Sequence, residues 1–251
     1  HAVGDHREPP SADAVPGILM LRTGLTLPLL DEDRLVDAVT RRILSVADAA
    51  GMDIVLCLVD NGSQDGTRAR IRTLAGSDDR IRGVYLDENA GYGGGILAGM
   101  RYLVGIADLD IVGWAWGDGQ VDPSVLPTLV RACTDGAMMA KARRVERRDG
   151  RRRRFVSQAY AAVTRGLGVR TPDVNGCPKL LRREAWLTLS PRSRDWFLDP
   201  EVILGAEERG WRIADAPVVM QPRMAGRSKV DWRTAAEFGW NLARWQRGWR
   251  P

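Results

Sequence analysis

Two oxygen-bearing side chains, Asp118 and Gln120, directly follow an apolar stretch, residues 111–116, whose composition predicts a short buried strand. A carboxylate at this point is expected to lie where the chain emerges from the core. Mg²⁺ is commonly held by only one or two carboxylates plus the phosphates of a substrate. Asp118 and Gln120 are therefore predicted to hold Mg²⁺ or Mn²⁺ for a substrate that carries a diphosphate.

Two further segments have the residue types of a nucleotide site. Asp60 ends a second apolar stretch, residues 52–60, where it could bind a base or a ribose; the alternative is an Asx turn that caps the next helix. The sequence GYGGG at 91–95 predicts a loop that lets backbone amides approach an anion near a helix N-terminus. It matches neither the G-x-G-x-x-G fingerprint nor a P-loop.

The histidines and cysteines exclude several chemistries. The histidines are His1 and His6, both in a polar, Pro-rich segment, residues 1–16, that is predicted to be disordered. Ser-His-Asp and Cys-His catalysis and His-ligated zinc are therefore not expected, and carboxylates, Lys or Tyr must carry any acid–base step. The three scattered cysteines form no disulfide framework or C-x-x-C site, which favours a cytoplasmic setting with thiols in the core. No apolar run approaches the ~18–20 residues that span a bilayer.

The net charge of +5 is concentrated in one block, residues 141–154, which holds eight arginines and one lysine against Glu146 and Asp149. Such a block can bind nucleic acid, anionic lipid headgroups or a phosphorylated substrate. It can equally be a solvated loop, and the sequence leaves both interpretations open.

Alternating strand and helix patterns must position these residues. Apolar stretches at 17–28, 52–60, 80–86, 110–116 and 136–142 predict strands, and helical spacing or capping signals predict helices from 31, over 67–75 and over 123–133. This alternation predicts an α/β fold whose parallel sheet is covered on both faces. Ligands of such sheets bind at the carboxyl ends of the strands, which places Asp60, residues 91–95 and Asp118 along one edge.

Several segments together resemble family-2 glycosyltransferases. The resemblance covers roughly residues 17–229 and is nearest to the dolichol- and polyprenyl-phosphate sugar synthases. It implies a GT-A fold with one mostly parallel central sheet over 17–229, a nucleotide-diphosphate sugar donor, a divalent metal ion and inversion at the anomeric carbon. The matching segments are LPLLDEDRL (27–35), VDNGSQDGT (59–67), NAGYGGGILAG (89–99), DGQVDP (118–123), DVNGCPKLLRRE (173–184), DWFLDPEVILGAEERGWRIADAPV (195–218) and RMAGRSK (223–229).

The resemblance also implies roles for individual residues. It places Asp173 on the acceptor side and makes Asp199 and Glu201 the acidic pair in which a general base is often found. The resemblance assigns Asp118 and Gln120 as ligands of the metal ion. The expected nucleotide-sugar contacts are Pro28, Glu32, Asp60, Asn89, Gly91, Trp116 and Asp118, and the expected phosphate-binding residues are Arg223, Arg227, Ser228 and Lys229.

This chain departs from the family pattern at two positions. Trp116 stands where the D-x-D motif has its first Asp, and Asp31 replaces the more usual Asn before Glu32. The first departure removes one metal or ribose contact. Trp116 is expected either to stack on the sugar or ribose or to pack in the core.

The C-terminal segment, residues 230–251, predicts a separate amphipathic helix. Phe238, Leu242, Trp245 and Trp249 recur at helical spacing, with arginines nearby. Such a helix can lie on a membrane surface, or it can pack on the domain or on the second subunit of a homodimer.

The predicted function is transfer of a sugar from a nucleotide-diphosphate sugar to a polyprenyl phosphate, by a cytoplasmic enzyme with a possible peripheral membrane contact. Two other acceptor or partner classes remain open: a small soluble hydroxyl acceptor, such as a nucleoside or sugar intermediate, and nucleic acid, which is the less expected. A third interpretation is a transferase fold that lost activity through Trp116 and only binds nucleotide.

Overall fold

One seven-stranded sheet organises the part of the chain that the computed structural model describes, namely residues 21–147, 169–221, 240–241, 244–245 and 247–248. The strand order is β3-β2-β1-β4-β6-β5-β7, and β6 is the strand that runs antiparallel to its neighbours. The mostly parallel sheet confirms the predicted α/β fold. The strands are β1 (Thr23–Leu29), β2 (Ile54–Asn61), β3 (Ile81–Leu86), β4 (Ile111–Trp114), β5 (Met139–Arg147), β6 (Lys179–Arg182) and β7 (Ile213–Met220).

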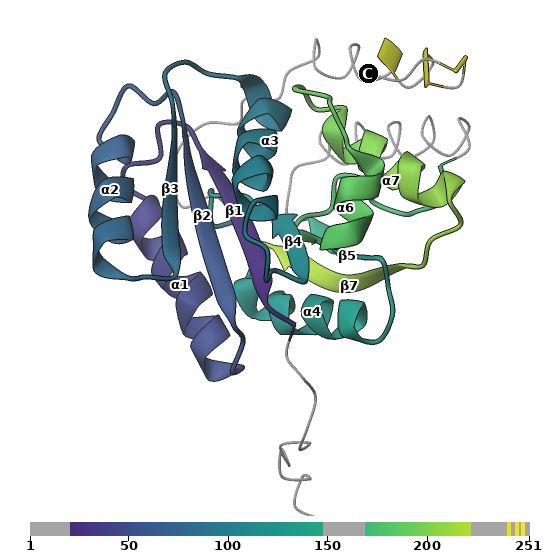
Figure 1. Ribbon diagram of the computed structural model, residues 1–251, viewed down its shortest axis with the longest axis horizontal. Helices are drawn as coiled ribbons and strands as arrows, with labels where there is room; N and C mark the ends of the chain where they lie inside the picture. Colours follow the sequence, from purple (N-terminus) through teal and green to yellow (C-terminus); the bar gives the residue numbers. More distant parts are fainter. Residues whose placement is uncertain (1–20, 148–168, 222–239, 242–243, 246, 249–251) are drawn as a thin grey trace, which may run out of the picture.

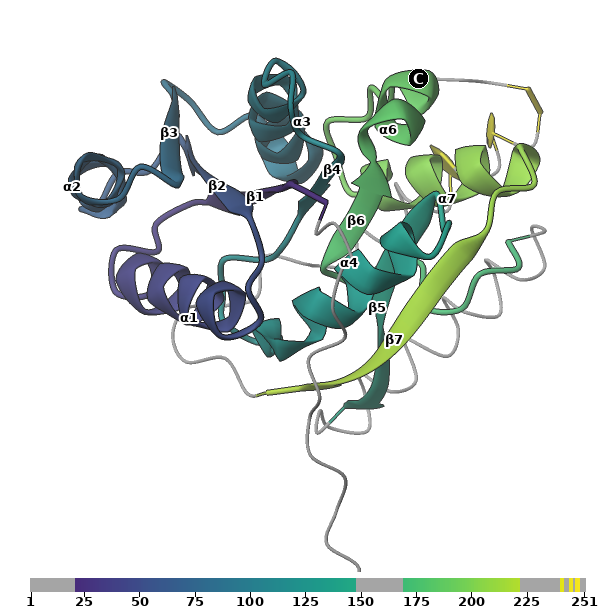
Figure 2. The same ribbon diagram turned by 60° about the horizontal axis from the view of Figure 1, so that its bottom comes forward.

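Helices cover both faces of this sheet (Figures 1 and 2). One face carries α1 (Val36–Ala49), α2 (Thr67–Ser77) and α4 (Leu126–Thr134), which follows a short 3-10 turn, Pro123–Val125. The other face carries α3 (Gly91–Val104), α6 (Arg183–Leu189) and α7 (Leu198–Glu208). Among the described residues, no helix combines the length and the apolar composition needed to cross a membrane.

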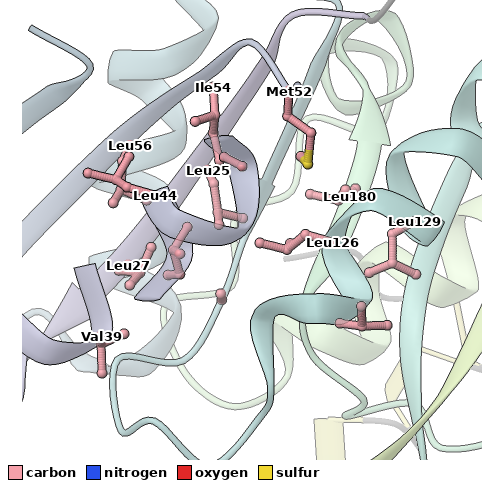
Figure 3. Packing of buried hydrophobic residues seen from close by; sticks show 14 of the residues in the cluster. Leu25, Leu27, Val39, Leu44, Met52, Ile54, Leu56, Leu126, Leu129 and Leu180 are labelled. Atoms are coloured by element: carbon pink, nitrogen blue, oxygen red, sulfur yellow. The ribbon is translucent and has the colours of Figure 1, made fainter. Parts of the chain in front are cut away.

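Each face of the sheet has its own apolar core. Alternate residues of β1 (Leu25, Leu27 and Leu29) belong to the core on the side of α1 and α4. Figure 3 shows Leu25 and Leu27 in this core together with Leu126 and Leu129. On the other face, Trp114, Phe197 and the apolar side of α3 form the second core. Strands buried on both faces explain why β1, β2 and β4 read as nearly continuous apolar runs.

The antiparallel β6 brings a second set of residues to the ligand edge. Its first residue, Lys179, pairs with Trp114 at the carboxyl end of β4 and with Lys141 on β5. The start of β6 therefore lies at the same edge as the carboxyl ends of the parallel strands. Residues that precede Lys179 reach this edge too.

Two predicted elements differ from the structure. The glycines at 91–95 are not a loop, because α3 begins at Gly91 and includes all of them. The predicted strand at 136–142 continues as β5 to Arg147, so the basic block begins inside the sheet and is not simply a solvated loop. The arm at 1–16 and the rest of the basic block lie outside the described residues.

Candidate active site

The predicted metal-binding pair, Asp118 and Gln120, lies just beyond the carboxyl end of β4. Asp118 is 9% exposed, and its Oδ1 accepts a hydrogen bond of 3.1 Å from the backbone N–H of Gln120. The backbone and side chain of Gln120 bind the backbone of Gln221, beyond β7, at 2.8 and 3.1 Å. These contacts hold the turn in place between β4 and the end of β7.

The donor set of this turn suits a hard divalent cation. A carboxylate and an amide oxygen are ligands that Mg²⁺ and Mn²⁺ accept, with phosphate oxygens completing the coordination. Asp118 and Gln120 would hold such an ion, which when bound neutralises charge on a diphosphate leaving group. Among the described residues, no group of three or more His, Cys, Asp or Glu side chains could hold a metal ion without help from a ligand.

Asp60 is fully buried, and its contacts are those of a turn-forming residue. Its Oδ1 accepts from the backbone N–H of Ser63 at 3.0 Å, and its Oδ2 pairs with Nε of Arg68 at 2.5 Å. The side chain thus closes a turn, as the alternative interpretation expected, but it does not cap the next helix, because α2 begins at Thr67 and its N-cap residue is Gly66. Arg68, which also binds the carbonyl of Leu86, covers the carboxylate at this edge.

The remaining expected nucleotide contacts gather beside Asp60. Asn61 binds three neighbouring groups: its amide nitrogen donates to Oδ1 of Asn89 at 3.3 Å and to the carbonyl of Gly91 at 3.0 Å, and its Oδ1 accepts from the N–H of Ala90. The backbone N–H of Glu32 donates to Oγ1 of Thr67 at 2.8 Å. Pro28 in β1 and Glu32 after it therefore lie at the same edge of the sheet as Asn89 and as Gly91, the first residue of α3.

The glycines of α3 serve close packing of the chain on itself. A Cβ on Gly93 would lie 2.3 Å from the carbonyl oxygen of Ser193, and the N–H of Gly94 donates to the carbonyl of Arg194 at 2.9 Å. Gly91 has a φ of +81°, which favours glycine. The sequence interpretation of these glycines as an anion-binding loop overlooked the 193–195 segment, which occupies that place.

Asp199, expected as a candidate base, is the centre of a buried hydrogen-bond network. Its Oδ1 pairs with the ammonium of Lys179 at 2.6 Å, and its Oδ2 accepts from the hydroxyl of Tyr92 at 3.0 Å. The indole N–H of Trp116 donates to the same hydroxyl at 3.2 Å. Burial, with the charge of Asp199 adding to it, raises the pKa of Tyr92 well above its ordinary value, so the phenol stays protonated as a donor.

The other two candidate bases also have specific partners. Both carboxylate oxygens of Glu201 accept backbone N–H groups, from Arg192 and Ser193, each at 2.9 Å. Asp173 pairs with the guanidinium of Arg144 through both oxygens. Burial alone would raise the pKa of Asp173, but the hydrogen bonds and charge of Arg144 outweigh it and hold that pKa below its ordinary value.

Two members of the basic block enter the site. Arg144, which is largely buried, lies over the ring of Trp116, 5.6 Å from the ring centre. Lys141 is fully buried and donates to the carbonyls of Pro172 and Asp173 at 2.8 and 3.0 Å. These two residues of the basic block therefore serve a structural role, because they hold residues 172–173, which precede β6, in place.

Sequence reasoning missed Tyr92, Lys179, Arg144 and Trp196, which stacks on Tyr92 with ring centres 4.0 Å apart. One signal was available: Lys179 lies between Cys177-Pro178 and Leu180-Leu181, and a cation among apolar residues requires a partner when it is buried. Asp118 also lies near Cys177, Lys179 and Asp199. Burial raises the pKa of the Cys177 thiol, Lys179 opposes the rise, and the charges of Asp199 and Asp118 add to it.

Parts of the predicted site lie outside the described residues, namely Arg223, Arg227, Ser228 and Lys229, as do Phe238, Leu242 and Trp249 of the Trp-rich segment. Trp245 of that segment packs on the body: it is 7% exposed, contacts the ring of Phe197 and donates to Glu208 at 3.0 Å. Asn241 donates to Asp195 at 3.2 Å. Trp240, by contrast, is 64% exposed.

Known glycosyltransferases match this chain in sequence. It is 29% identical over 155 residues to an undecaprenyl-phosphate 4-deoxy-4-formamido-L-arabinose transferase of Shewanella sediminis (61% of this chain, 45% of the relative). It is 28% identical over 236 residues to glycosyltransferase AglD of Haloferax volcanii (88% and 36%) and 30% identical over 217 residues to an uncharacterized glycosyltransferase of Mycobacterium tuberculosis (82% and 88%). The chain thus spans about half or less of the length of the first two relatives.

A solved structure and a family model agree with these relatives. Glucosyl-3-phosphoglycerate synthase from Mycobacterium tuberculosis, in complex with Mn²⁺, UDP and phosphoglyceric acid, superposes with a TM-score of 0.62 at 20% identity, over 89% of this chain and 76% of that chain. At this identity the likeness concerns the fold. The family model described as glycosyl transferase family 2 matches residues 28–189, and the chain belongs to that family.

Proposed function

We propose that this protein is an inverting, metal-assisted glycosyltransferase that moves a sugar from a nucleotide-diphosphate sugar to a polyprenyl phosphate. The donor half of the proposal rests on the oxygen ligands at Asp118 and Gln120 and on the nucleotide-side residues gathered at the carboxyl ends of β1 and β2. The similar synthase structure, which is a complex with Mn²⁺ and UDP, also supports it.

The observation that supports a polyprenyl-phosphate acceptor is that each of the three candidate bases already has a hydrogen-bond or ion-pair partner. Asp199, Glu201 and Asp173 are committed to Lys179, to backbone amides and to Arg144. A sugar or nucleoside hydroxyl needs a base to remove its proton in the transition state. A phosphate, whose second pKa is about 6, is already an anion near neutral pH and attacks without one. Two relatives whose names contain undecaprenyl phosphate point to the same acceptor class.

In the proposed reaction an acceptor phosphate oxygen attacks the anomeric carbon in a single displacement, as the nucleotide diphosphate leaves from the opposite side. The acceptor oxygen forms the new bond, and the leaving diphosphate takes the electron pair of the broken one. Asp118 and Gln120 would position the leaving group, together with the cationic segment from Arg223 to Lys229. Trp116 and the residues that hold it would shape the space between donor and acceptor.

The acceptor class is tested with a matched pair of lipids. The purified full chain is incubated with UDP- and GDP-sugars, Mn²⁺ and either undecaprenyl phosphate or undecaprenol, which has a hydroxyl in place of the phosphate. We expect a product with the phosphate alone, at a rate that falls as the pH drops below about 6 and the phosphate gains a proton. Turnover with undecaprenol, a nucleoside or a free sugar, and none with the lipid phosphate, would replace this proposal by the soluble-hydroxyl alternative.

The proposal includes a peripheral membrane contact through residues 230–251. Trp245 is turned toward α7, so the exposed Trp240 is the described residue of this segment that could enter a lipid headgroup layer. Nucleic-acid binding is less favoured, since Lys141 of the basic block is buried, Arg144 is largely buried and pairs with Asp173, and Arg143 pairs with Asp215.

A further inference from the structure

The loop that follows β1 is held by the turn between β2 and α2. The backbone N–H groups of residues 31, 32 and 33 donate, in that order, to Oγ of Ser63, Oγ1 of Thr67 and Oδ2 of Asp65, at 3.1, 2.8 and 3.1 Å. Consecutive amides of the loop are thus bound by alternate side chains of a turn that is distant in the sequence. The loop, which contains the expected nucleotide contact Glu32, therefore takes its shape from this turn.

The turn that supplies these acceptors is itself fixed. Oδ1 of Asp65 accepts from the backbone N–H of Thr67 at 2.9 Å, and Thr67 is fully buried. The backbone N–H of Ser63 donates to Asp60 at 3.0 Å. Partial burial would raise the pKa of Asp65, but hydrogen bonds from Thr67 and from the backbone of Asp33 outweigh it and lower that pKa, so the carboxylate stays a charged acceptor.

The hydrogen bonds to residues 31–33 exceed what the start of α2 requires. α2 begins at Thr67, whose own N–H is already satisfied by the local bond to Asp65. The hydroxyl of Thr67 and the second oxygen of Asp65 are therefore not needed to cap the helix. They are spent on a different loop, at the ligand edge of the sheet.

Asp31 adds a hydrogen bond in the opposite direction. Its Oδ1 accepts from the backbone N–H of Gln64 at 2.8 Å, and its φ of +53° lies in the left-handed region. A non-glycine residue keeps such a conformation where its surroundings over-determine it, and such residues cluster at ligand-binding segments. The loop is thus held in an unusual backbone shape by hydrogen bonds that run both ways between it and the turn.

We propose that Ser63, Asp65 and Thr67 are positioning residues for the nucleotide-sugar donor. They hold residues 31–33 in the binding conformation before the donor arrives, so the donor does not lose affinity by ordering this loop. The inference rests on the proposed function, because it assigns Glu32 and its neighbours to the donor. Their loss should weaken donor binding and leave the turnover of the saturated enzyme nearly unchanged, since these side chains are directed to backbone amides of the loop.

The test compares two changes of the buried Thr67. Thr67→Val removes the hydroxyl at nearly constant shape, whereas Thr67→Ser keeps it. Titration calorimetry with UDP and with GDP, each with Mn²⁺, should show binding weakened roughly three- to tenfold in Thr67→Val and restored in Thr67→Ser. With the active donor, KM should rise by the same factor while kcat stays within about twofold. Thr73→Val, an exposed position on the same helix whose hydroxyl binds the carbonyl of Ala69, is the control and should change neither.

A second measurement needs no nucleotide. Hydrogen exchange of the amides of residues 31–33 is followed by NMR on the isotope-labelled full chain. We expect these amides to be protected in wild type without nucleotide, and the amide of Glu32 to lose its protection in Thr67→Val. Ser63→Ala removes the acceptor of the Asp31 amide at a half-buried position, and it gives the same comparison if Thr67→Val does not fold.

The outcomes separate this inference from the proposed function. Unprotected amides at residues 31–33 of nucleotide-free wild type would overturn the inference, whatever reaction the protein catalyses. Protected amides with equal nucleotide affinity in Thr67→Val and Thr67→Ser would overturn it too, since the loop would then not serve the donor. A fall in kcat as large as the loss of affinity would contradict a purely positioning role. If wild type binds no nucleotide diphosphate although its amides are protected, the proposed function fails and the inference falls with it.

Discussion

Lys179 and Asp199 form an ion pair with an N–O distance of 2.6 Å, and both side chains are closed to solvent. Removing two charges from water is costly, and the pair is tolerated because each charge meets the other and Tyr92 supplies a further hydrogen bond. A general base must reach the proton it removes. We therefore propose that Asp199 anchors Tyr92 and Trp116, as an alternative to the role of base that its place in the sequence predicts.

The first prediction concerns this pair. Asp199→Asn leaves the Lys179 ammonium buried without its counter-ion, so we expect the free energy of unfolding to fall by about 3–5 kcal/mol. Adding Lys179→Met should restore much of the stability, which chemical denaturation can measure. If Asp199 is an anchor, the double variant should keep its turnover within about tenfold of wild type. A stable double variant whose turnover has dropped by about two decades or more would make Asp199 a base.

Tyr92→Phe tests the link between Asp199 and Trp116. The change removes the acceptor of the indole N–H and the donor to Asp199, while the ring can still stack on Trp196. We expect a loss of about 1–3 kcal/mol in unfolding free energy, together with a lower kcat. Tyr102→Phe, on the same helix and 40% exposed, is the control and should change neither. Equal behaviour of the two variants would show that the hydrogen bonds of Tyr92 contribute nothing.

The glycines of α3 and α2 should respond to alanine with opposite signs. In Gly93→Ala the new Cβ would lie 2.3 Å from the carbonyl of Ser193, so the 193–195 segment must shift and the melting temperature should fall. A Cβ on Gly76 in α2 has no atom within 4 Å, and Gly76→Ala should stabilise by about 0.4–1 kcal/mol. Thermal denaturation of both variants measures the two effects. An unchanged melting temperature in Gly93→Ala would mean that the close approach is not needed.

Lys141 gives a pH dependence whose sign can be worked out. Burial, aided by the charge of Lys179, lowers its pKa from 10.5 to about 8. Between those values the unfolded chain binds more protons than the folded one, so stability from this group rises with pH. Relative to Lys141→Met, the unfolding free energy of wild type should therefore increase by roughly 1 kcal/mol per pH unit above about 8. A difference between the two proteins that stays flat up to pH 10 would contradict the low pKa.

Two tryptophans of the C-terminal segment form a matched pair. Trp245→Ala removes a buried ring that contacts Phe197, and it should cost about 3–5 kcal/mol of stability if the segment unfolds together with the body. Trp240→Ala should change stability by less than about 0.5 kcal/mol but should weaken binding to vesicles that contain anionic lipid. Co-sedimentation of both variants with such vesicles checks this. Equal vesicle binding by wild type and Trp240→Ala would remove Trp240 from any membrane contact.

Much of the fold could be predicted because its determinants are local. Apolar runs such as residues 52–60 and the helical spacing of Leu35, Val39 and Ile43 each specify an element from neighbouring residues, and β2 and α1 follow closely. The strand-end position of Asp118 follows from the same pattern, since parallel strands end at one edge of the sheet. The triple glycine of α3 was interpreted wrongly, because its contact partner lies about a hundred residues further along the chain.

The sequence by itself determined the α/β alternation, the lack of histidines in residues 7–251 and the oxygen-bearing turn after β4. Only the tertiary structure decided which carboxylates are committed to a partner. Asp199 looks the same in sequence whether it is a base or an anchor. Its partners, Lys179 and Tyr92, reach it from β6 and α3, so its pairing cannot be inferred from the residues next to it in the sequence. Pairing and desolvation depend on contacts between distant segments, and these exist only once the sheet and the helices on its two faces have assembled.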